Sequence, residues 1–191
     1  AVNTVDDKDL LKKMRKSGCW NIFFGYETGV EELAKNILTN KKNRDFEKMK
    51  RISRWTREAG IETRAGFLVG LPGETPELAK KTIQTAIDLD PDYAQFTVCC
   101  PYPGTKLADE IHEGKWGKFL THDLKEYNMW KVTWLPFGYK NAEELKNMER
   151  YAFRKFYLRP SYIIRRILTI RSFEDIKRYI KGGTALIKGF L

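Results

Sequence analysis

Hydrophobic and polar positions follow two different periods along the first 112 residues of the chain. Short apolar runs rich in aromatic and β-branched residues alternate with stretches in which apolar residues recur every three or four positions. The short runs predict strands, and the longer stretches predict amphipathic helices. The predicted strands are residues 19–24, 61–69 and 93–100, and the predicted helices are residues 6–17, 30–38, 46–59, 76–89 and 107–111.

This order of elements predicts an α/β fold. Helices that alternate with strands are typical of parallel strands joined by right-handed crossovers. Three strands are few for a closed barrel. We therefore expect residues 1–112 to form the later part of a sheet or barrel whose first strands lie upstream.

The remainder of the chain divides into two segments. Residues 113–140 show neither period and are rich in Trp, Tyr and Phe, so we expect an ordered irregular segment that packs on the core. Residues 141–191 form a basic tail with helical periodicity. Its predicted helices are residues 142–158, residues 160–168 and residues 173–180.

Composition places the chain among globular proteins. Of its 191 residues, 42% are hydrophobic and 31% are charged, a balance that disordered chains lack. No apolar run approaches the roughly 20 residues that cross a bilayer, and the first residues lack the apolar core of a signal peptide. We therefore expect a cytoplasmic location.

The three cysteines, Cys19, Cys99 and Cys100, are too few and too unevenly placed for a disulfide framework. They include no CxxC pair, so the sequence predicts no zinc or other metal site. Free cysteines are most often small buried residues, which is the role we expect for these three.

The net charge of +10 leaves three classes of partner open: nucleic acid, an anionic membrane surface and acidic ligands. Many of the basic residues lie in the tail, on predicted helices that also carry apolar residues such as Ile163 and Leu168. The plainest interpretation is a solvated basic face on a packed helix. The alternatives are a module that binds nucleic acid and a peripheral contact with a membrane.

Candidate site residues follow the predicted strands, because the carboxyl ends of parallel strands form the ligand site in α/β folds. Glu27 follows the first strand, where its carboxylate can bind ligand hydroxyls or amines, or cap the next helix. Gly66 indicates either close approach of a ligand or packing beneath a bulky neighbour. The turn at residues 70–75 starts a helix, so we expect Glu74 to have a structural role.

Three segments in register resemble the later barrel strands of radical S-adenosylmethionine (SAM) enzymes. The resemblance covers about residues 1–112, and residues 156–160 are similar to a tail segment of the cobalamin-binding branch of that family, typified by anaerobic magnesium-protoporphyrin monomethyl ester cyclase. The three segments are Phe23-Phe24-Gly25-Tyr26-Glu27-Thr28-Gly29, Gly66-Phe67-Leu68-Val69-Gly70-Leu71-Pro72-Gly73-Glu74-Thr75 and Pro101-Tyr102-Pro103-Gly104-Thr105.

The resemblance implies a partial barrel of the triosephosphate-isomerase type that holds SAM against an iron–sulfur cluster. The radical formed by SAM cleavage would serve hydrogen abstraction, methylation or cyclisation, with cobalamin in some relatives. By position, Glu27 would contact the SAM ribose or methionine part, and Gly66 the ribose and adenine. Thr97 and Cys99 match the adenine-facing strand, and Lys41 or Lys42 matches a basic residue that meets the SAM carboxylate.

The chain departs from the family in one respect, because it lacks the CxxxCxxC loop that binds the cluster. Cys99 and Cys100 are adjacent and cannot replace it, since three thiolates are needed to leave one iron for SAM. We therefore expect the chain alone to be inactive and to need an N-terminal half of the barrel and a cobalamin-binding domain. The expected substrate is a small molecule, a tetrapyrrole or a lipid.

Overall fold

The computed structural model describes residues 5, 7–37, 45–128, 131–170, 172–174, 176, 177, 179, 180 and 184. The helices are α1 (Lys8–Lys16), α2 (Glu31–Ile37), α3 (Phe46–Glu58), α4 (Pro76–Leu89), α5 (Lys106–His112), α6 (Ala142–Tyr157) and α7 (Pro160–Leu168), with a 3₁₀ turn η2 at Leu124–Glu126. The strands are β1 (Asn21–Glu27), β2 (Glu62–Val69), β3 (Tyr93–Val98), β4 (Gly117–Phe119) and β5 (Trp134–Pro136).

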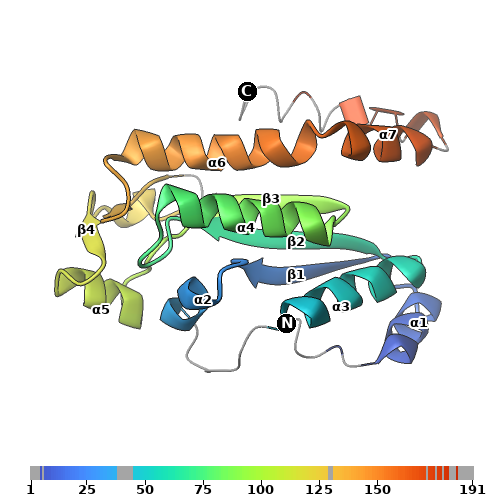
Figure 1. Cartoon of the computed structure of the whole chain (residues 1–191), viewed down its shortest axis with the longest axis horizontal. Coiled ribbons are helices and arrows are strands. Elements are labelled where there is room, and N and C mark those ends of the chain that lie inside the picture. Colours follow the sequence, from blue (N-terminus) through green and yellow to red (C-terminus); the bar gives the residue numbers. More distant parts are fainter. Residues whose placement is uncertain are drawn as a thin grey trace.

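The centre of the fold is a parallel sheet in the order β1-β2-β3 (Figure 1). Helices connect its consecutive strands, and a helical region follows it along the chain. This arrangement confirms the predicted α/β fold with three parallel strands and a helical C-terminal region. No helix in the described part of the chain is long and apolar enough to cross a membrane.

The two faces of the sheet differ because side chains alternate along each strand. In β2 the side chains of Ala65, Phe67 and Val69 are buried in the core, whereas Arg64, which directly precedes Ala65, is exposed. In β1 the exposed residue is Phe23, with 55% of its surface accessible. We call the face that carries Phe23 and Arg64 the open face.

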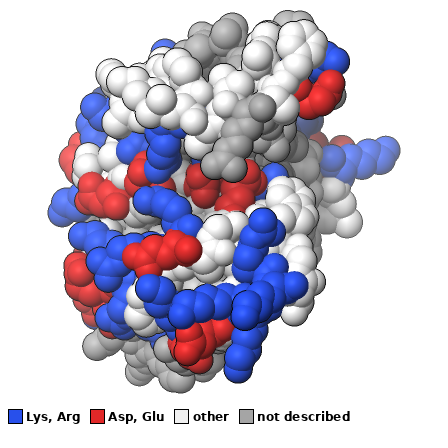
Figure 2. All heavy atoms as spheres, turned by 90° about the vertical axis from the view of Figure 1, so that its right-hand side faces the viewer, with Lys and Arg blue, Asp and Glu red and all other residues white. Residues whose placement is uncertain are grey.

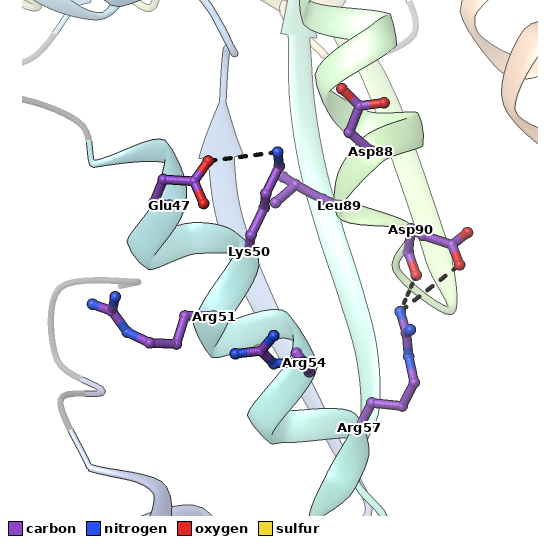
Figure 3. Close-up of a pocket in the computed structure, with 8 residues that line it drawn as sticks. All are labelled: Glu47, Lys50, Arg51, Arg54, Arg57, Asp88, Leu89 and Asp90. Carbon is purple, nitrogen blue, oxygen red and sulfur yellow. Dashed lines mark hydrogen bonds and ion pairs between the residues drawn. The ribbon is translucent and has the colours of Figure 1, made fainter.

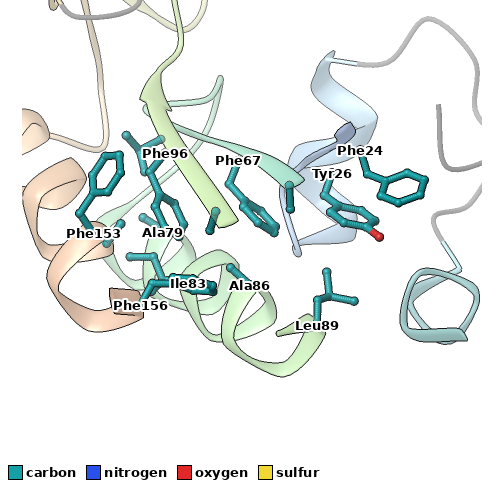
Figure 4. Packing of buried hydrophobic residues seen from close by; sticks show 14 of the residues in the cluster. Phe24, Tyr26, Phe67, Ala79, Ile83, Ala86, Leu89, Phe96, Phe153 and Phe156 are labelled. Atoms are coloured by element: carbon teal, nitrogen blue, oxygen red, sulfur yellow. The ribbon is translucent and has the colours of Figure 1, made fainter. Parts of the chain in front are cut away.

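A row of aromatic rings crosses the buried face of the sheet (Figure 4). The ring centroids of Phe24 and Tyr26 lie 5.8 Å apart, and the row continues through Phe67 and Phe96 to Phe153 of α6 at spacings of 5.8, 5.5 and 5.5 Å. Each buried ring contributes about 1.5–3 kcal/mol through removal of its surface from water. The row joins all three strands to α6 in one core.

The outer edge of β3 is covered by a tyrosine of α6. The hydroxyl of Tyr157 accepts a hydrogen bond from the Ala94 N–H at 3.1 Å and donates one to the Ala94 carbonyl at 2.7 Å. A buried backbone group without a partner is costly. One side chain therefore satisfies both polar groups that Ala94 presents at this edge.

Helix α7 is held at the start of β3 by two aspartates. Asp90 ends α4 in the left-handed region, at φ 46°, and its carboxylate binds Arg159 at 3.1 Å and also Arg165. Asp92 binds the guanidinium of Arg166 at 2.8 Å. These ion pairs attach the tail helices to the amino-terminal end of the strand.

The structure corrects two of the predictions. The first strand does not end at residue 24 but continues to Glu27 through an irregularity in its pairing with β2. The segment 113–140 is not wholly irregular, because β4 and β5 pair antiparallel within it. The expectation that this segment packs on the core is confirmed by Trp134, which is fully buried.

The hydroxyl at the edge of β3 leads to a test by denaturation. Tyr157→Phe leaves the N–H and carbonyl of Ala94 without their partner, and we expect it to lower the free energy of unfolding by about 1–3 kcal/mol. Urea unfolding measures this loss. Tyr151→Phe, on the exposed side of the same helix, is the control; equal stability of the two variants would contradict the edge-capping role.

Candidate functional site

Glu27 lies at the carboxyl end of β1 in an unusual backbone conformation. Its φ is +60°, which is uncommon for a residue with a side chain. The pairing register shifts between Gly25 and Glu27, which places the carboxylate beside Gly25. A Cβ at Gly25 would lie 2.5 Å from Glu27 Oε1, so the glycine leaves room for the carboxylate on the open face.

Gly66 is the neighbour of Gly25 in the sheet and pairs with Gln95 on its other side. A Cβ at Gly66 would lie 2.7 Å from Cζ of Phe23. The ring of Phe23 therefore uses the space above this glycine, as the packing interpretation of Gly66 requires. The two adjacent glycines thus make room on the open face for the Glu27 carboxylate and for the Phe23 ring, which is itself exposed.

Thr97 lies in β3 and Cys99 directly after its end, and the two residues have different surroundings. Thr97 pairs with Leu68 and lies near the carboxyl end of the strand, with only 8% of its surface accessible. Cys99 is buried in an apolar cluster with Leu71 and Trp134, and its carbonyl accepts the Trp134 indole N–H at 2.8 Å. Burial raises the pKa of the Cys99 thiol to about 12, so the thiol stays neutral at physiological pH.

The structure thus brings together three of the five predicted site residues. By strand alternation, Gly66 and Thr97 share the open face with the Glu27 carboxylate. Cys99 lies in the apolar cluster instead, and Lys41 falls outside the described residues. The sequence analysis missed Phe23, although its alternation with the buried Phe24 was the signal that places it on this face.

Glu74 lies in the turn that follows β2 and stabilises this turn. Its side chain is fully buried, and Oε1 accepts hydrogen bonds from the Gly70 N–H and from the Tyr139 hydroxyl at 2.7 Å. The backbone of Gly138 also packs directly on this turn, since a Cβ there would lie 2.0 Å from the Glu74 carbonyl oxygen. Burial raises the pKa of Glu74 to about 7. These contacts fit the predicted structural role.

No group of three or more His, Cys, Asp or Glu in the described residues could hold a metal ion. The rings of His112 and His122 stack at 5.7 Å, and that of Phe119 lies 4.7 Å from His112. This cluster supplies two imidazoles and no carboxylate or thiolate. We therefore interpret this cluster as a packing contact.

A groove of about 360 Å³ lies on the outer surface between α3 and the end of α4 (Figure 3). Its charged side chains are paired: Lys50 Nζ lies 3.6 Å from Glu47 Oε1 within α3, and Arg57 Nη2 lies 3.9 Å from Asp90 Oδ2 across the groove. The groove is on the helix-covered side of the sheet. It is therefore separate from the site on the open face.

Comparison with known proteins indicates which family this chain resembles. The sequence model described as the Radical SAM superfamily matches residues 1–86. An uncharacterized methyltransferase of Pyrococcus horikoshii is 32% identical over 184 residues, which are 95% of this chain and 38% of that protein. The anaerobic magnesium-protoporphyrin IX monomethyl ester cyclase of Cereibacter sphaeroides is 33% identical over 155 residues, 81% of this chain and 24% of that protein.

Among solved structures, the chain is similar to the radical SAM methyltransferase TsrM of Kitasatospora setae. The structure of TsrM with tryptophan and a SAM analogue aligns with a TM-score of 0.53 and 27% identity, over 58% of this chain and 21% of that one. A second TsrM structure holds cobalamin and a [4Fe-4S] cluster. The present chain therefore spans well under half the length of these relatives.

The buried carboxyl of Glu74 generates a pH prediction. Its pKa is about 7 in the folded chain and about 4.5 when exposed, so the folded state holds the proton more tightly. The contribution of Glu74 to the free energy of unfolding is then fully present below pH 4.5 and falls by about 3 kcal/mol as the pH rises to about 7. We expect Glu74→Gln to remove this loss in urea unfolding measured across that range.

Glu149 is the appropriate internal reference for this experiment. It is a second buried carboxyl whose pKa is raised by burial. The free energy of unfolding therefore depends on pH in the unsubstituted chain and also in Glu74→Gln. The contribution of Glu74 is the difference between the two curves. A Glu74→Gln curve parallel to that of the unsubstituted chain would rule out the raised pKa.

The environment of Cys99 generates a prediction about thiol reactivity. A buried thiol with a raised pKa reacts slowly with alkylating reagents, because the thiolate is the nucleophile. With iodoacetamide at mildly alkaline pH, we expect Cys19, which is partly exposed, to be modified well before Cys99. Peptide mass spectrometry reads each site, and denatured protein is the control. Equal rates in the folded chain would place Cys99 at the surface.

Proposed function

The chain belongs to the radical SAM superfamily, and we propose that its open sheet face binds SAM within a radical SAM enzyme that methylates or cyclises its substrate. The observation that carries this proposal is the placement of the Glu27 carboxylate, Gly66 and Thr97 on one face of the sheet. Such a surface fits a ligand with a sugar, an amine and a flat base.

Each residue offers a different contact to SAM. The Glu27 carboxylate accepts hydrogen bonds from the ribose hydroxyls or the methionine amine. The Phe23 ring lies over Gly66 and is itself exposed, so we propose that it offers the adenine an apolar surface at this position. Thr97 lies near the carboxyl end of β3 with 8% of its surface accessible, and we propose that its hydroxyl contacts one edge of the adenine.

SAM supplies radical chemistry only together with a [4Fe-4S] cluster, and the described residues do not fit a cluster. Cys99 is neutral and buried, and its neighbour Cys100 hydrogen-bonds to Thr133. We propose that the cluster loop comes from another part of the parent protein. The greater length of the relatives supports this proposal.

The missing part of the barrel has a defined place to join. In the described structure, β2 pairs with one edge of β1, and no strand pairs with the other edge. We propose that an upstream parallel strand pairs there and extends the sheet toward a barrel. A cobalamin-binding domain is part of the same proposal, because the TsrM structure that resembles this chain contains cobalamin.

The relatives indicate the type of reaction, and the substrate is part of the same proposal. The names of the two sequence relatives give methyl transfer and cyclisation. We propose a small molecule, a tetrapyrrole or a lipid as substrate. Nucleic acid is not part of this proposal, because the names of the two sequence relatives give no nucleic-acid substrate.

Glu27 tests the proposed SAM site. In the complete enzyme, we expect Glu27→Gln to raise the Kd for SAM about tenfold or more, since a charge-assisted hydrogen bond contributes about 1.5–3 kcal/mol. Isothermal titration calorimetry measures the change. Glu62→Gln, at the opposite end of the same face, is the matched control. Unchanged affinity of Glu27→Gln, or an equal loss in both variants, would refute the site.

A further inference from the structure

Helix α7 carries polar side chains on its inner face and apolar side chains on its outer face. On the inner face, Tyr162 and Arg166 are buried and contact Asp92: the Tyr162 hydroxyl donates to its carbonyl at 3.0 Å, and Arg166 pairs with its carboxylate. A helix on a protein surface normally has the reverse arrangement. The outer residues are Ile163, Ile164, Ile167 and Leu168, which are 43%, 58%, 59% and 78% exposed.

Exposed apolar residues continue on either side of α7 along the chain. Leu158 precedes the helix, and Phe173 and Ile180 follow it, each with more than half of its surface accessible. In Figure 2 the upper part of the molecule, where α7 lies in Figure 1, is largely white, whereas charged residues crowd the lower part. Single exposed apolar residues are ordinary, but a group of this size marks an interaction surface.

The charge around this surface indicates what it binds. Residues 154–191 contain ten Lys and Arg but only two acidic residues, Glu174 and Asp175. Three of the ten, Arg159, Arg165 and Arg166, pair with Asp90 and Asp92. The other seven are Arg154, Lys155, Arg171, Lys177, Arg178, Lys181 and Lys188.

An apolar helix face in a strongly basic segment matches an anionic bilayer. The apolar side chains enter the boundary between headgroups and acyl chains, and the basic residues are attracted to the anionic lipids. A second copy of the chain fits less well, because it would bring two segments of the same charge together. An apolar protein partner would leave the basic excess without a role.

We propose that α7 and the residues that follow it bind the surface of an anionic lipid bilayer, with Ile163, Ile164, Ile167 and Leu168 in the interfacial layer. The contact is peripheral. Its position is defined by Asp90 and Asp92, which hold α7 at the amino-terminal end of β3, whereas Glu27 lies at the carboxyl end of β1 (Figure 1). The bilayer therefore anchors the molecule at the end of the sheet opposite the candidate SAM site.

Vesicle co-sedimentation of the 191-residue chain tests the proposal. The probes are vesicles of phosphatidylcholine alone and vesicles of phosphatidylcholine mixed with phosphatidylglycerol. We expect binding to the mixed vesicles, weakened about fivefold for each Lys or Arg removed, as in Lys155→Gln. The double variant Ile164→Asp with Ile167→Asp should bind at least about tenfold more weakly, because two apolar side chains no longer enter the lipid.

Leu124→Asp is the matched control, because Leu124 is 67% exposed on η2, outside the tail. It should bind vesicles like the unsubstituted chain. Thermal unfolding of each variant shows that the fold is retained, as expected for substitutions at exposed positions. The proposal is overturned if the unsubstituted chain does not co-sediment with anionic vesicles, or if Leu124→Asp weakens binding as much as the double variant. A dimer in lipid-free buffer that the double variant dissociates would overturn it in favour of self-association.

Discussion

The packing of aromatic rings on one face of β1, β2 and β3 is the interaction on which the rest of the structure depends. Tyr26, Phe67 and Phe96 each need a neighbour on the next strand, so the register of the sheet follows from their contacts. Residues between them are then turned to the other face. That alternation places Gly66 and Thr97 on the open face, and the shift in register after Gly25 adds the carboxylate of Glu27.

The two edges of the sheet differ, because the outer edge of β3 is covered by other parts of the chain and the outer edge of β1 is not covered by any described strand or helix. The outer edge of β3 is closed by the Tyr157 hydroxyl and by the tail helices that Asp90 and Asp92 hold in place. No described strand or helix closes the outer edge of β1 in the same way. Since exposed strand edges recruit further strands, the sheet can extend only beyond β1. This asymmetry agrees with a barrel whose other strands pair on that side.

Local sequence signals predicted the elements because they depend on neighbouring residues. The Thr75 cap and Pro76 at the start of α4, for example, act within one turn of helix. The β4–β5 pair was missed because Gly117 fits against the Leu135 carbonyl across a gap in sequence that no periodicity records. In the site, the sequence indicated Glu27 through its position after a strand. It could not show that Cys99 is buried beside Trp134, since that contact depends on how distant segments pack.

The polarity of α7 follows from the same tertiary constraint that closes the sheet. Asp90 and Asp92 need cations, and Arg159, Arg165 and Arg166 supply them from α7 and the residue before it. The turn of the helix then directs Ile163, Ile164 and Ile167 away from the protein, because residues three and four apart share a face. Burying the isoleucines instead would remove the ion pairs of Arg165 with Asp90 and of Arg166 with Asp92 at the start of β3. The exposed apolar face is therefore a consequence of how the tail docks on the sheet. This face is the surface that we propose binds a lipid bilayer.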